Sequence, residues 1–206
     1  MFIVFEGLDG SGKSTISKKI FSILNKKYKV IFTKEPCGTS FKKKFKNLIS
    51  TINSKNFFES EILLFEAERI IHLKEKIIPA IKEKKIVISD RFIDSSLVYQ
   101  GLKNNFDLKK ILNLHKNFSP KLIPDLTFYF YADEKTLLER IKKRKKIDKF
   151  DDEVLKNIIK YKDYYENLYK NYKISKKIIK IDNTKRTINS ILKEVLSEIY
   201  NFLGNN

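Results

Sequence analysis

The chain has 206 residues, of which 43 are Lys or Arg and 25 are Asp or Glu, so its formal net charge is +18. This length suits one folded domain with a substantial core. No run of about 18 apolar residues occurs, so we expect no membrane span. The first apolar run is too short for a signal peptide, and the single cysteine, Cys37, excludes an internal disulfide and fits a reducing cytoplasm.

The positive charge has two interpretations. A basic surface can mark a protein that binds nucleic acid. Lysine, isoleucine and asparagine are all abundant here, however, and the lysines spread over the whole chain, as a coding bias toward A and T would produce. We therefore expect no nucleic acid as natural substrate, and only weak nonspecific binding to polyanions at low salt.

Predicted strands and helices alternate along the chain. Apolar, β-rich runs predict strands at 2–6, 30–33, 85–90, 126–131 and 178–182. Helical periodicity is found at 13–26, at 57–83 as one long helix or two in sequence, and at 188–202. Strands separated by helices need right-handed crossovers, which favours an α/β fold of three layers, with a five-stranded parallel sheet and helices on both faces. We expect one domain, 1–206, whose ligands bind at the carboxyl ends of the strands.

A glycine-rich run follows the first predicted strand. It reads Gly-Leu-Asp-Gly-Ser-Gly-Lys-Ser from Gly7 to Ser14 and fits the phosphate-binding pattern G-x-x-x-x-G-K-[ST] between a strand and a helix. In that setting, backbone N–H groups and the helix N-terminus surround an anion, which a chance match in a turn would not provide. Lys13 is then expected to reach the β- and γ-phosphates, and the Ser14 hydroxyl to bind Mg²⁺. The sequence thus predicts a P-loop NTPase fold with these ATP-binding residues: Gly7, Leu8, Asp9, Gly10, Ser11, Gly12, Lys13, Ser14 and Thr15.

Asp90 and Arg91 end the third predicted strand, at the same edge as the phosphate loop. A carboxylate there is placed to hold Mg²⁺, directly or through water, and an arginine can bind a phosphate through two hydrogen bonds. A helix-capping aspartate beside a surface arginine is the alternative. The neighbouring loop favours the binding interpretation.

A basic segment lies late in the chain. Seven of the ten residues from 140 to 149 are Lys or Arg. They could form a solvated helix face. We favour a lid, at about 140–152, because phosphoryl transfer needs cations at the moving group and closure excludes water.

Aromatic and histidine residues give weaker signals. Phe65 and Arg69 are four residues apart and share a helix face, so they could stack on a base and hydrogen-bond its edge. A core phenylalanine beside a surface arginine is the commoner arrangement. His72 and His115 have no partner at ligand spacing and are interpreted as structural, and no Cys/His cluster suggests zinc.

Five segments together resemble the thymidylate kinase family. They are 5–15, 34–39, 63–69, 90–101 and 124–130. The phosphate loop is shared by many families, whereas the Asp-Arg-Phe-Ile-Asp-Ser-Ser-Leu-Val-Tyr-Gln-Gly run at 90–101 is similar to the family's most specific signature. The resemblance covers nearly the whole chain. It implies a cytoplasmic, homodimeric dTMP kinase that uses ATP and Mg²⁺ to form dTDP for dTTP synthesis.

The resemblance also implies how the acceptor is bound. Phe65 stacks on thymine, Arg69 and Ser96 hydrogen-bond its edge, and Tyr99 crowds the 2′ position of the sugar. Further substrate-binding residues implied by the matched motifs are Glu35, Pro36, Ser95 and Gln100.

The transferred phosphate has its own implied set of residues. Arg91 holds the acceptor phosphate, and Asp9 lies near the acceptor's sugar and phosphate. No basic residue occupies the loop between Gly7 and Gly12, so the chain resembles the bacterial type that carries its catalytic arginine in the lid. The catalytic residues implied are Lys13, Asp9, Arg91, Arg140, Arg144 and Lys149.

Three positions depart from the family pattern. Lys34 and Lys149 stand where arginine is usual and lack its planar fork. For Lys149 in the lid, slower turnover is expected. Cys37 replaces the first of two glycines and would be strained if that position needs a positive φ.

Two other functions stay open. The chain could be another nucleoside monophosphate kinase of similar fold, or a binding protein that keeps the loop without chemistry. The intact Lys13, Ser14, Asp90 and Arg91 argue against the second.

Overall fold

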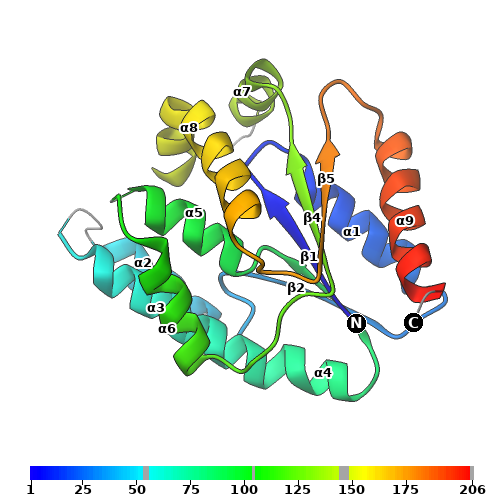
Figure 1. The fold of residues 1–206 in the computed structure, drawn as a ribbon, viewed down its shortest axis with the longest axis horizontal. Helices are drawn as coiled ribbons and strands as arrows, with labels where there is room; N and C mark the ends of the chain where they lie inside the picture. The colour runs from blue at the N-terminus through cyan, green and yellow to red at the C-terminus, as the bar shows by residue number, and fades with distance from the viewer. Residues whose placement is uncertain (53–55, 104, 144–148, 205–206) are drawn as a thin grey trace.

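A five-stranded parallel sheet forms the centre of the molecule (Figure 1). The computed structural model describes residues 1–52, 56–103, 105–143 and 149–204, without the side chains of 102–103 and 149–156. The strands lie in the order β2-β3-β1-β4-β5, and each neighbouring pair is parallel. Their bounds are β1 Phe2–Gly7, β2 Val30–Lys34, β3 Ile86–Asp90, β4 Leu126–Tyr131 and β5 Lys177–Asp182. The predicted parallel α/β sheet is confirmed, with strand bounds within one residue.

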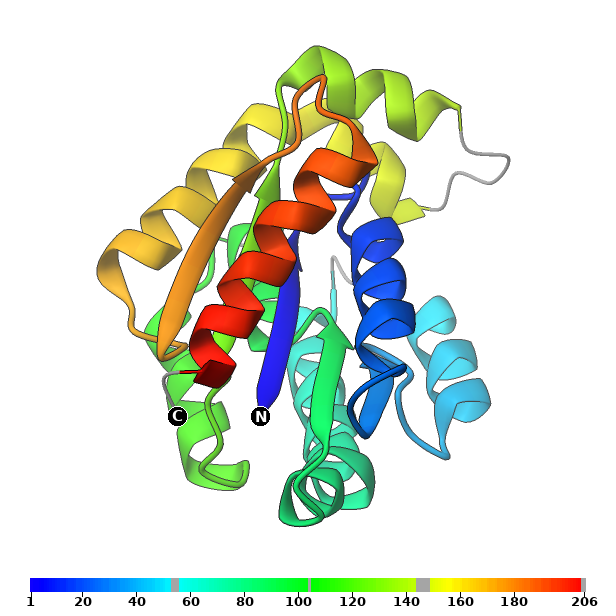
Figure 2. The same cartoon turned by 90° about the vertical axis from the view of Figure 1, so that its right-hand side faces the viewer.

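Helices cover both faces of this sheet. Their bounds are α1 Lys13–Leu24, α2 Lys42–Thr51, α3 Phe58–His72, α4 Ile78–Lys82, α5 Ile93–Lys103, α6 Leu108–Phe118, α7 Glu134–Lys142, α8 Lys149–Asn171 and α9 Ile188–Gly204. Helices α1 and α9 lie side by side on one face, in blue and red in Figure 2. None of the described helices is long and apolar enough to cross a bilayer.

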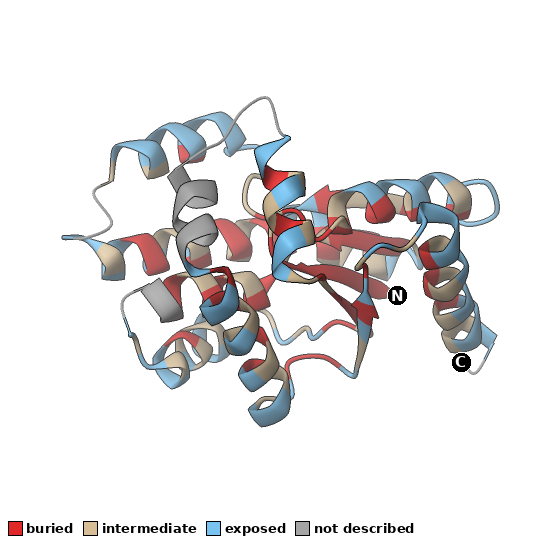
Figure 3. Cartoon of the chain, turned by 90° about the horizontal axis from the view of Figure 1, so that it is seen from above, coloured by how far each residue is buried: buried red, intermediate tan, exposed pale blue. Residues whose placement is uncertain are grey.

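The core is divided by the sheet into two apolar layers. In β1, Phe2 and Val4 pack toward one face with residues of α5 and α8, whereas Ile3 and Phe5 pack toward α1 and α9. This follows from the alternation of side chains along a strand. Burial on both faces explains why β1 reads as a continuous apolar run. Figure 3 shows the buried residues concentrated on the strands and on the sides of the helices that face them.

The long helix predicted at 57–83 is divided in the structure. After α3, the chain makes a π-helical turn, η1, at Leu73–Ile77 and continues as α4. Pro79 lies in the first turn of α4. Because proline has no N–H to donate to residue 75, the hydrogen-bond pattern must change near this point.

Some helices of the structure have no counterpart among the predicted ones. Helix α2 contains four lysines and buries Phe45, while α5 and α6 lie between the third and fourth strands. Tyr161, Tyr165 and Tyr169 follow helical spacing along α8 and pack in the core, and Tyr172, directly after the helix, packs against the same core.

Candidate active site

The phosphate loop joins the end of β1 to the start of α1. Gly7, Gly10 and Gly12 all have positive φ, at 135°, 81° and 89°. A Cβ at Gly7 would lie 2.1 Å from the carbonyl oxygen of Phe130, so no larger residue fits there. The geometry therefore requires the glycines that the sequence motif contains.

Lys13 is buried at the base of this loop, 3 % exposed. Its Nζ lies 3.4 Å from Asp9 Oδ1. Burial lowers the pKa of Lys13, and the positive charge of Arg91 lowers it further, whereas Asp9 and Asp90 raise it. A cation held in this way would gain from a bound polyphosphate, because the anion offsets both unfavourable effects.

Arg91 brings four parts of the predicted site together. Its Nη1 donates to the carbonyl of Gly7 at 3.1 Å and to Ser95 Oγ at 2.8 Å. Its Nη2 donates to Asp9 Oδ1 at 3.0 Å and to Tyr99 Oη at 3.3 Å. The backbone of Arg91 has φ 76°, a conformation that is costly for any residue with a Cβ and that here aims the side chain at the phosphate loop.

Glu6 fixes the turn that carries Arg91, and sequence reasoning missed it. The carboxylate is fully buried and accepts hydrogen bonds from the Phe92 N–H at 2.7 Å, from Ser95 Oγ at 2.7 Å and from Tyr165 Oη at 3.2 Å. Burial raises the pKa of Glu6, and the nearby charge of Arg91 opposes that rise. The available signal was an acidic residue inside an otherwise apolar strand.

Asp90 ends β3 next to Arg91, as predicted. Its Oδ1 is buried and has no hydrogen-bond partner among the described residues. The negative charge of Asp90 raises the pKa of Lys13 and so opposes the effect of burial. A buried, unpaired carboxylate oxygen beside a phosphate loop is suited to a hard cation with oxygen ligands.

Arg140 lies at the phosphate loop, although the lid beyond it falls partly outside the described residues. Its Nη1 donates to the carbonyl of Gly10 at 3.3 Å and its Nη2 to that of Asn183 at 3.0 Å. Asn183, which follows β5, donates to the Ser11 carbonyl at 2.7 Å. The sequence did not single out Asn183. Arg144 and the side chain of Lys149 lie outside the described residues.

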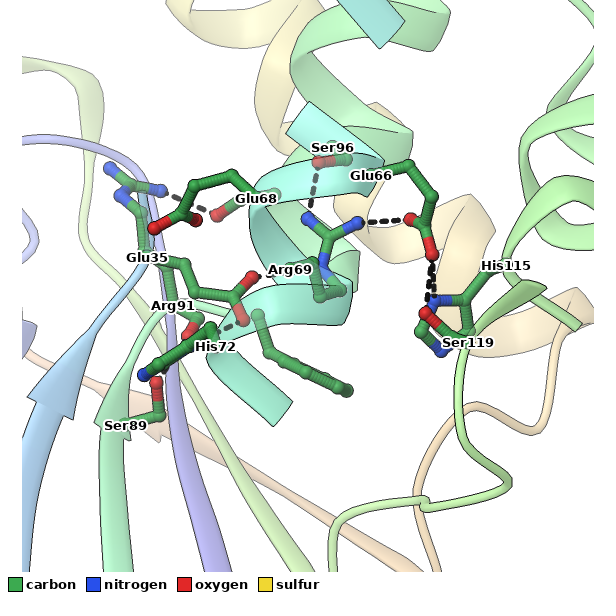
Figure 4. A network of polar contacts seen from close by, with 12 residues as sticks. Glu35, Glu66, Glu68, Arg69, His72, Ser89, Arg91, Ser96, His115 and Ser119 are labelled. Carbon is green, nitrogen blue, oxygen red and sulfur yellow. Dashed lines mark hydrogen bonds and ion pairs between the residues drawn. The ribbon is translucent and has the colours of Figure 1, made fainter. Parts of the chain in front are cut away.

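A second polar cluster surrounds Arg69 (Figure 4). Its Nε donates to Glu35 Oε2 at 2.8 Å, its Nη1 to Glu66 Oε2 at 2.6 Å and its Nη2 to Ser96 Oγ at 2.6 Å. The surface arginine considered as the commoner alternative is therefore wrong, because Arg69 is 2 % exposed. The structure brings together three of the residues expected to bind the acceptor and adds Glu66, which sequence reasoning did not identify.

Both histidines contact this cluster. His72 is fully buried, with Nδ1 2.9 Å from Glu35 Oε1 and Nε2 2.6 Å from Thr33 Oγ1. His115 Nδ1 lies 2.8 Å from Glu66 Oε1. Among the described residues, no group of His, Cys, Asp and Glu is arranged to hold a metal ion without further ligands.

The remaining predicted acceptor residues lie nearby. Phe65 is partly exposed and packs edge-on against Phe45 at a ring-centroid distance of 5.5 Å. Gln100 is buried, donates to Glu61 and leaves its Oε1 without a described partner. Cys37, next to Pro36, has φ 75°, so the position that departs from the family pattern does need a positive φ.

The comparisons with known proteins agree with this geometry. The thymidylate kinase family model matches residues 5–193. The chain is 38 % identical to a thymidylate kinase of Onion yellows phytoplasma, over 97 % of this chain and 98 % of the relative, and 35 % identical to one of Finegoldia magna, over 95 % and 96 %. The crystal structure of a thymidylate kinase from Ehrlichia chaffeensis matches with a TM-score of 0.75 and 30 % identity, covering 97 % of this chain and 98 % of that one. The chain therefore belongs to the thymidylate kinase family, the nucleoside monophosphate kinases that phosphorylate dTMP.

Proposed function

We propose that Asp9, Lys13 and Arg91 form the point at which the γ-phosphoryl group of ATP passes to the 5′-phosphate of dTMP. The observation that carries this assignment is the position of the Asp9 carboxylate. Its Oδ1 lies 3.4 Å from Lys13 Nζ and 3.0 Å from Arg91 Nη2. The cation expected to bind the donor and the cation expected to bind the acceptor thus meet at one side chain.

The chemistry needs positioning and charge neutralisation. The acceptor is a phosphate monoester with a second pKa of about 6, so it is mostly a dianion at neutral pH and needs no general base. Its oxygen attacks the γ-phosphorus while the bond from that phosphorus to the β–γ bridging oxygen breaks, and ADP leaves. Arg91 orients the attacking phosphate, and Lys13 neutralises charge on the donor.

Ser14 and Asp90 would hold Mg²⁺. Ser14 is the second residue of α1, directly after Lys13, and the buried Oδ1 of Asp90, which has no described partner, is free to accept a cation or its bound water. When bound, Mg²⁺ neutralises charge on the β- and γ-phosphates. Asp90 then has the partner that its buried oxygen lacks among the described residues.

The nucleoside would lie between the two polar clusters. Tyr99 contacts Arg91 and would crowd the 2′ position of the sugar, while Arg69 and Ser96 would meet the edge of thymine. Phe65, partly exposed on α3 four residues before Arg69, would stack on the ring. The loop residues Glu35 and Pro36, together with Ser95 and Gln100 of α5, complete the proposed acceptor site.

The lid and the assembly are further parts of the proposal. The lid at about 140–152 would supply Arg140, Arg144 and Lys149, and the contact of Arg140 with Gly10 supports its position beside the loop. We also propose one domain over 1–206 and a homodimer in the cytoplasm. Exposed apolar side chains on and beside α3 and α6, such as Phe57, Leu63 and Phe118, are available for contact with a second copy of the chain.

A phosphorylation panel tests the proposed acceptor. ADP release from ATP is measured with dTMP, dUMP, dCMP, dGMP and UMP, with and without Mg²⁺. We expect dTMP to give the highest kcat/KM and turnover to require Mg²⁺. Equal or better turnover of another nucleotide would assign the chain to a different monophosphate kinase, and no turnover with any acceptor would favour a binding protein.

A further inference from the structure

Arg69 has a defined number of hydrogen-bond donors left for a ligand. A guanidinium carries five N–H groups and no acceptor. Glu35, Glu66 and Ser96 accept one each, from Nε, Nη1 and Nη2. One N–H on each terminal nitrogen is left over. The direction of these two donors depends on how the plane of the guanidinium is held.

Glu66 uses one carboxylate oxygen to hold Arg69 and the other to bind α6. Its Oε2 accepts from Arg69 Nη1, whereas its Oε1 accepts from His115 Nδ1 at 2.8 Å and from Ser119 Oγ at 2.6 Å (Figure 4). His115 lies in the last turn of α6, and Ser119 is the residue that caps this helix. The carboxylate therefore connects the arginine on α3 to the end of α6.

The protonation of this link follows from its chemistry. Burial alone would raise the pKa of Glu66, but the hydrogen bond from His115 and the charge of Arg69 lower it to about 2. The carboxylate is therefore ionised at neutral pH and can only accept hydrogen bonds. His115 must carry a proton on Nδ1, which fixes the orientation of its ring.

The ring of Phe92 contacts both Arg69 and His115. The Arg69 Cζ lies 5.7 Å from the centre of the Phe92 ring, and the His115 ring meets the same ring edge-on at 5.9 Å and 87°. Phe92 therefore lies against both Arg69 and His115. The guanidinium is thus held by the carboxylates of Glu35 and Glu66 and lies over the Phe92 ring.

We propose that Glu66, anchored by His115 and Ser119, is a positioning residue that aims the two remaining N–H groups of Arg69 at a carbonyl oxygen of the acceptor's base. This rests on the proposed role of Arg69 at the base. Two N–H donors favour a pyrimidine with a carbonyl at that edge and disfavour one with an amino group there. The link from α6 would then set the preference for dTMP over dCMP without touching the nucleotide.

The test compares variants that break and restore the link. His115→Leu removes the donor to Glu66, whereas His115→Asn places an amide nitrogen at about the position of Nδ1. Arg69→Leu removes the proposed base contact itself. Glu59→Ala, which removes an exposed glutamate from the same helix, is the matched control. KM and kcat are measured for dTMP, dCMP and ATP, together with the melting temperature.

We expect His115→Leu to raise the KM for dTMP about tenfold, as for the loss of a well-oriented hydrogen bond to a charged group. The dTMP-to-dCMP ratio of kcat/KM should fall by a similar factor, while the KM for ATP stays within about twofold. His115→Asn should restore most of the loss, and Glu59→Ala should match the wild type. If His115 had only a structural role, His115→Leu would lower the melting temperature without changing the KM for dTMP more than the KM for ATP.

Two results would overturn the proposal in different ways. If Arg69→Leu weakens dTMP binding but His115→Leu changes neither the KM for dTMP nor the dTMP-to-dCMP ratio, the link does not position the arginine. If Arg69→Leu itself leaves dTMP binding unchanged, the assignment of Arg69 to the base is wrong, and the inference is wrong with it.

Discussion

The guanidinium of Arg91 donates to the carboxylate of Asp9 at 3.0 Å, which joins the end of β3 to the phosphate loop after β1. The two residues are 82 positions apart in the chain. Parallel pairing of the two strands places their carboxyl ends at one edge, and this contact then fixes the turn after β3 against the phosphate loop.

Replacing Lys13 by alanine tests the donor side of this arrangement. We expect kcat to fall by about a thousandfold or more, because a preorganised cation at the transferring phosphate is lost. The fold should persist, since Asp9 keeps its ion pair with Arg91. Steady-state kinetics and circular dichroism measure the two effects. Near-normal turnover in a folded variant would contradict the role given to Lys13.

Glu6→Gln tests how Arg91 is held in place. The amide can accept from the Phe92 N–H, but it presents N–H groups where Ser95 and Tyr165 now donate. We expect kcat/KM for dTMP to fall at least about tenfold, with a smaller change in the KM for ATP. Tyr165→Phe removes only one of these donors and should have a smaller effect. If Glu6→Gln keeps normal dTMP kinetics, Glu6 does not position Arg91.

Glu66→Gln tests the pH dependence of stability. The pKa of Glu66 is lowered to about 2 in the folded protein, so its contribution is present above the unfolded pKa, near 4.5, and is lost as pH falls toward 2. We expect the variant to be less stable by about 2–3 kcal/mol at neutral pH. In urea unfolding, the difference in free energy of unfolding between wild type and variant should become smaller by about 1 kcal/mol when the pH is lowered from 5 to 3.5.

Both of those pH values lie below the ordinary titration range of histidine, so the change reports the carboxylate. If the difference in free energy of unfolding between wild type and variant stays constant over this interval, the fold does not stabilise the ionised form of Glu66.

Cys37→Gly tests the backbone strain predicted where this chain departs from the family pattern. With φ at 75°, Cys37 adopts a conformation that glycine enters without steric cost. We expect the free energy of unfolding to rise by up to about 1 kcal/mol. The greater freedom of glycine in the unfolded chain reduces this gain in stability. This corresponds to about 2–4 °C in melting temperature for a chain of this size. Cys37→Ala removes the thiol but keeps the strain, and an equal gain in that variant would contradict this explanation.

Much of the sheet and of the phosphate loop could be predicted because their signals are local. An apolar run such as 2–6 is typical of a strand buried on both faces, and the glycine spacing before Lys13 is typical of a phosphate loop between a strand and a helix. Helix α2 was missed because four of its residues are lysines and Phe45 is its one buried residue, so its sequence shows no clear apolar face.

The carboxylates of the site could not be predicted in the same way. Glu6 reads as the polar end of a strand, yet it is fully buried. Glu66 meets His115 across 49 positions of sequence, and only the packing of α3 against α6 brings them together. Arg69 was weighed as a surface residue because one of the two carboxylates that neutralise it, Glu35, is 34 positions away in the chain.

The positive φ of Arg91 has a consequence for how this position would respond to selection. In a library screened only for resistance to unfolding, glycine or asparagine should be enriched at position 91, because both enter this conformation at lower cost. A library screened for growth that depends on the kinase should retain arginine. Disagreement between the two screens at one position would mark it as a place where activity opposes stability.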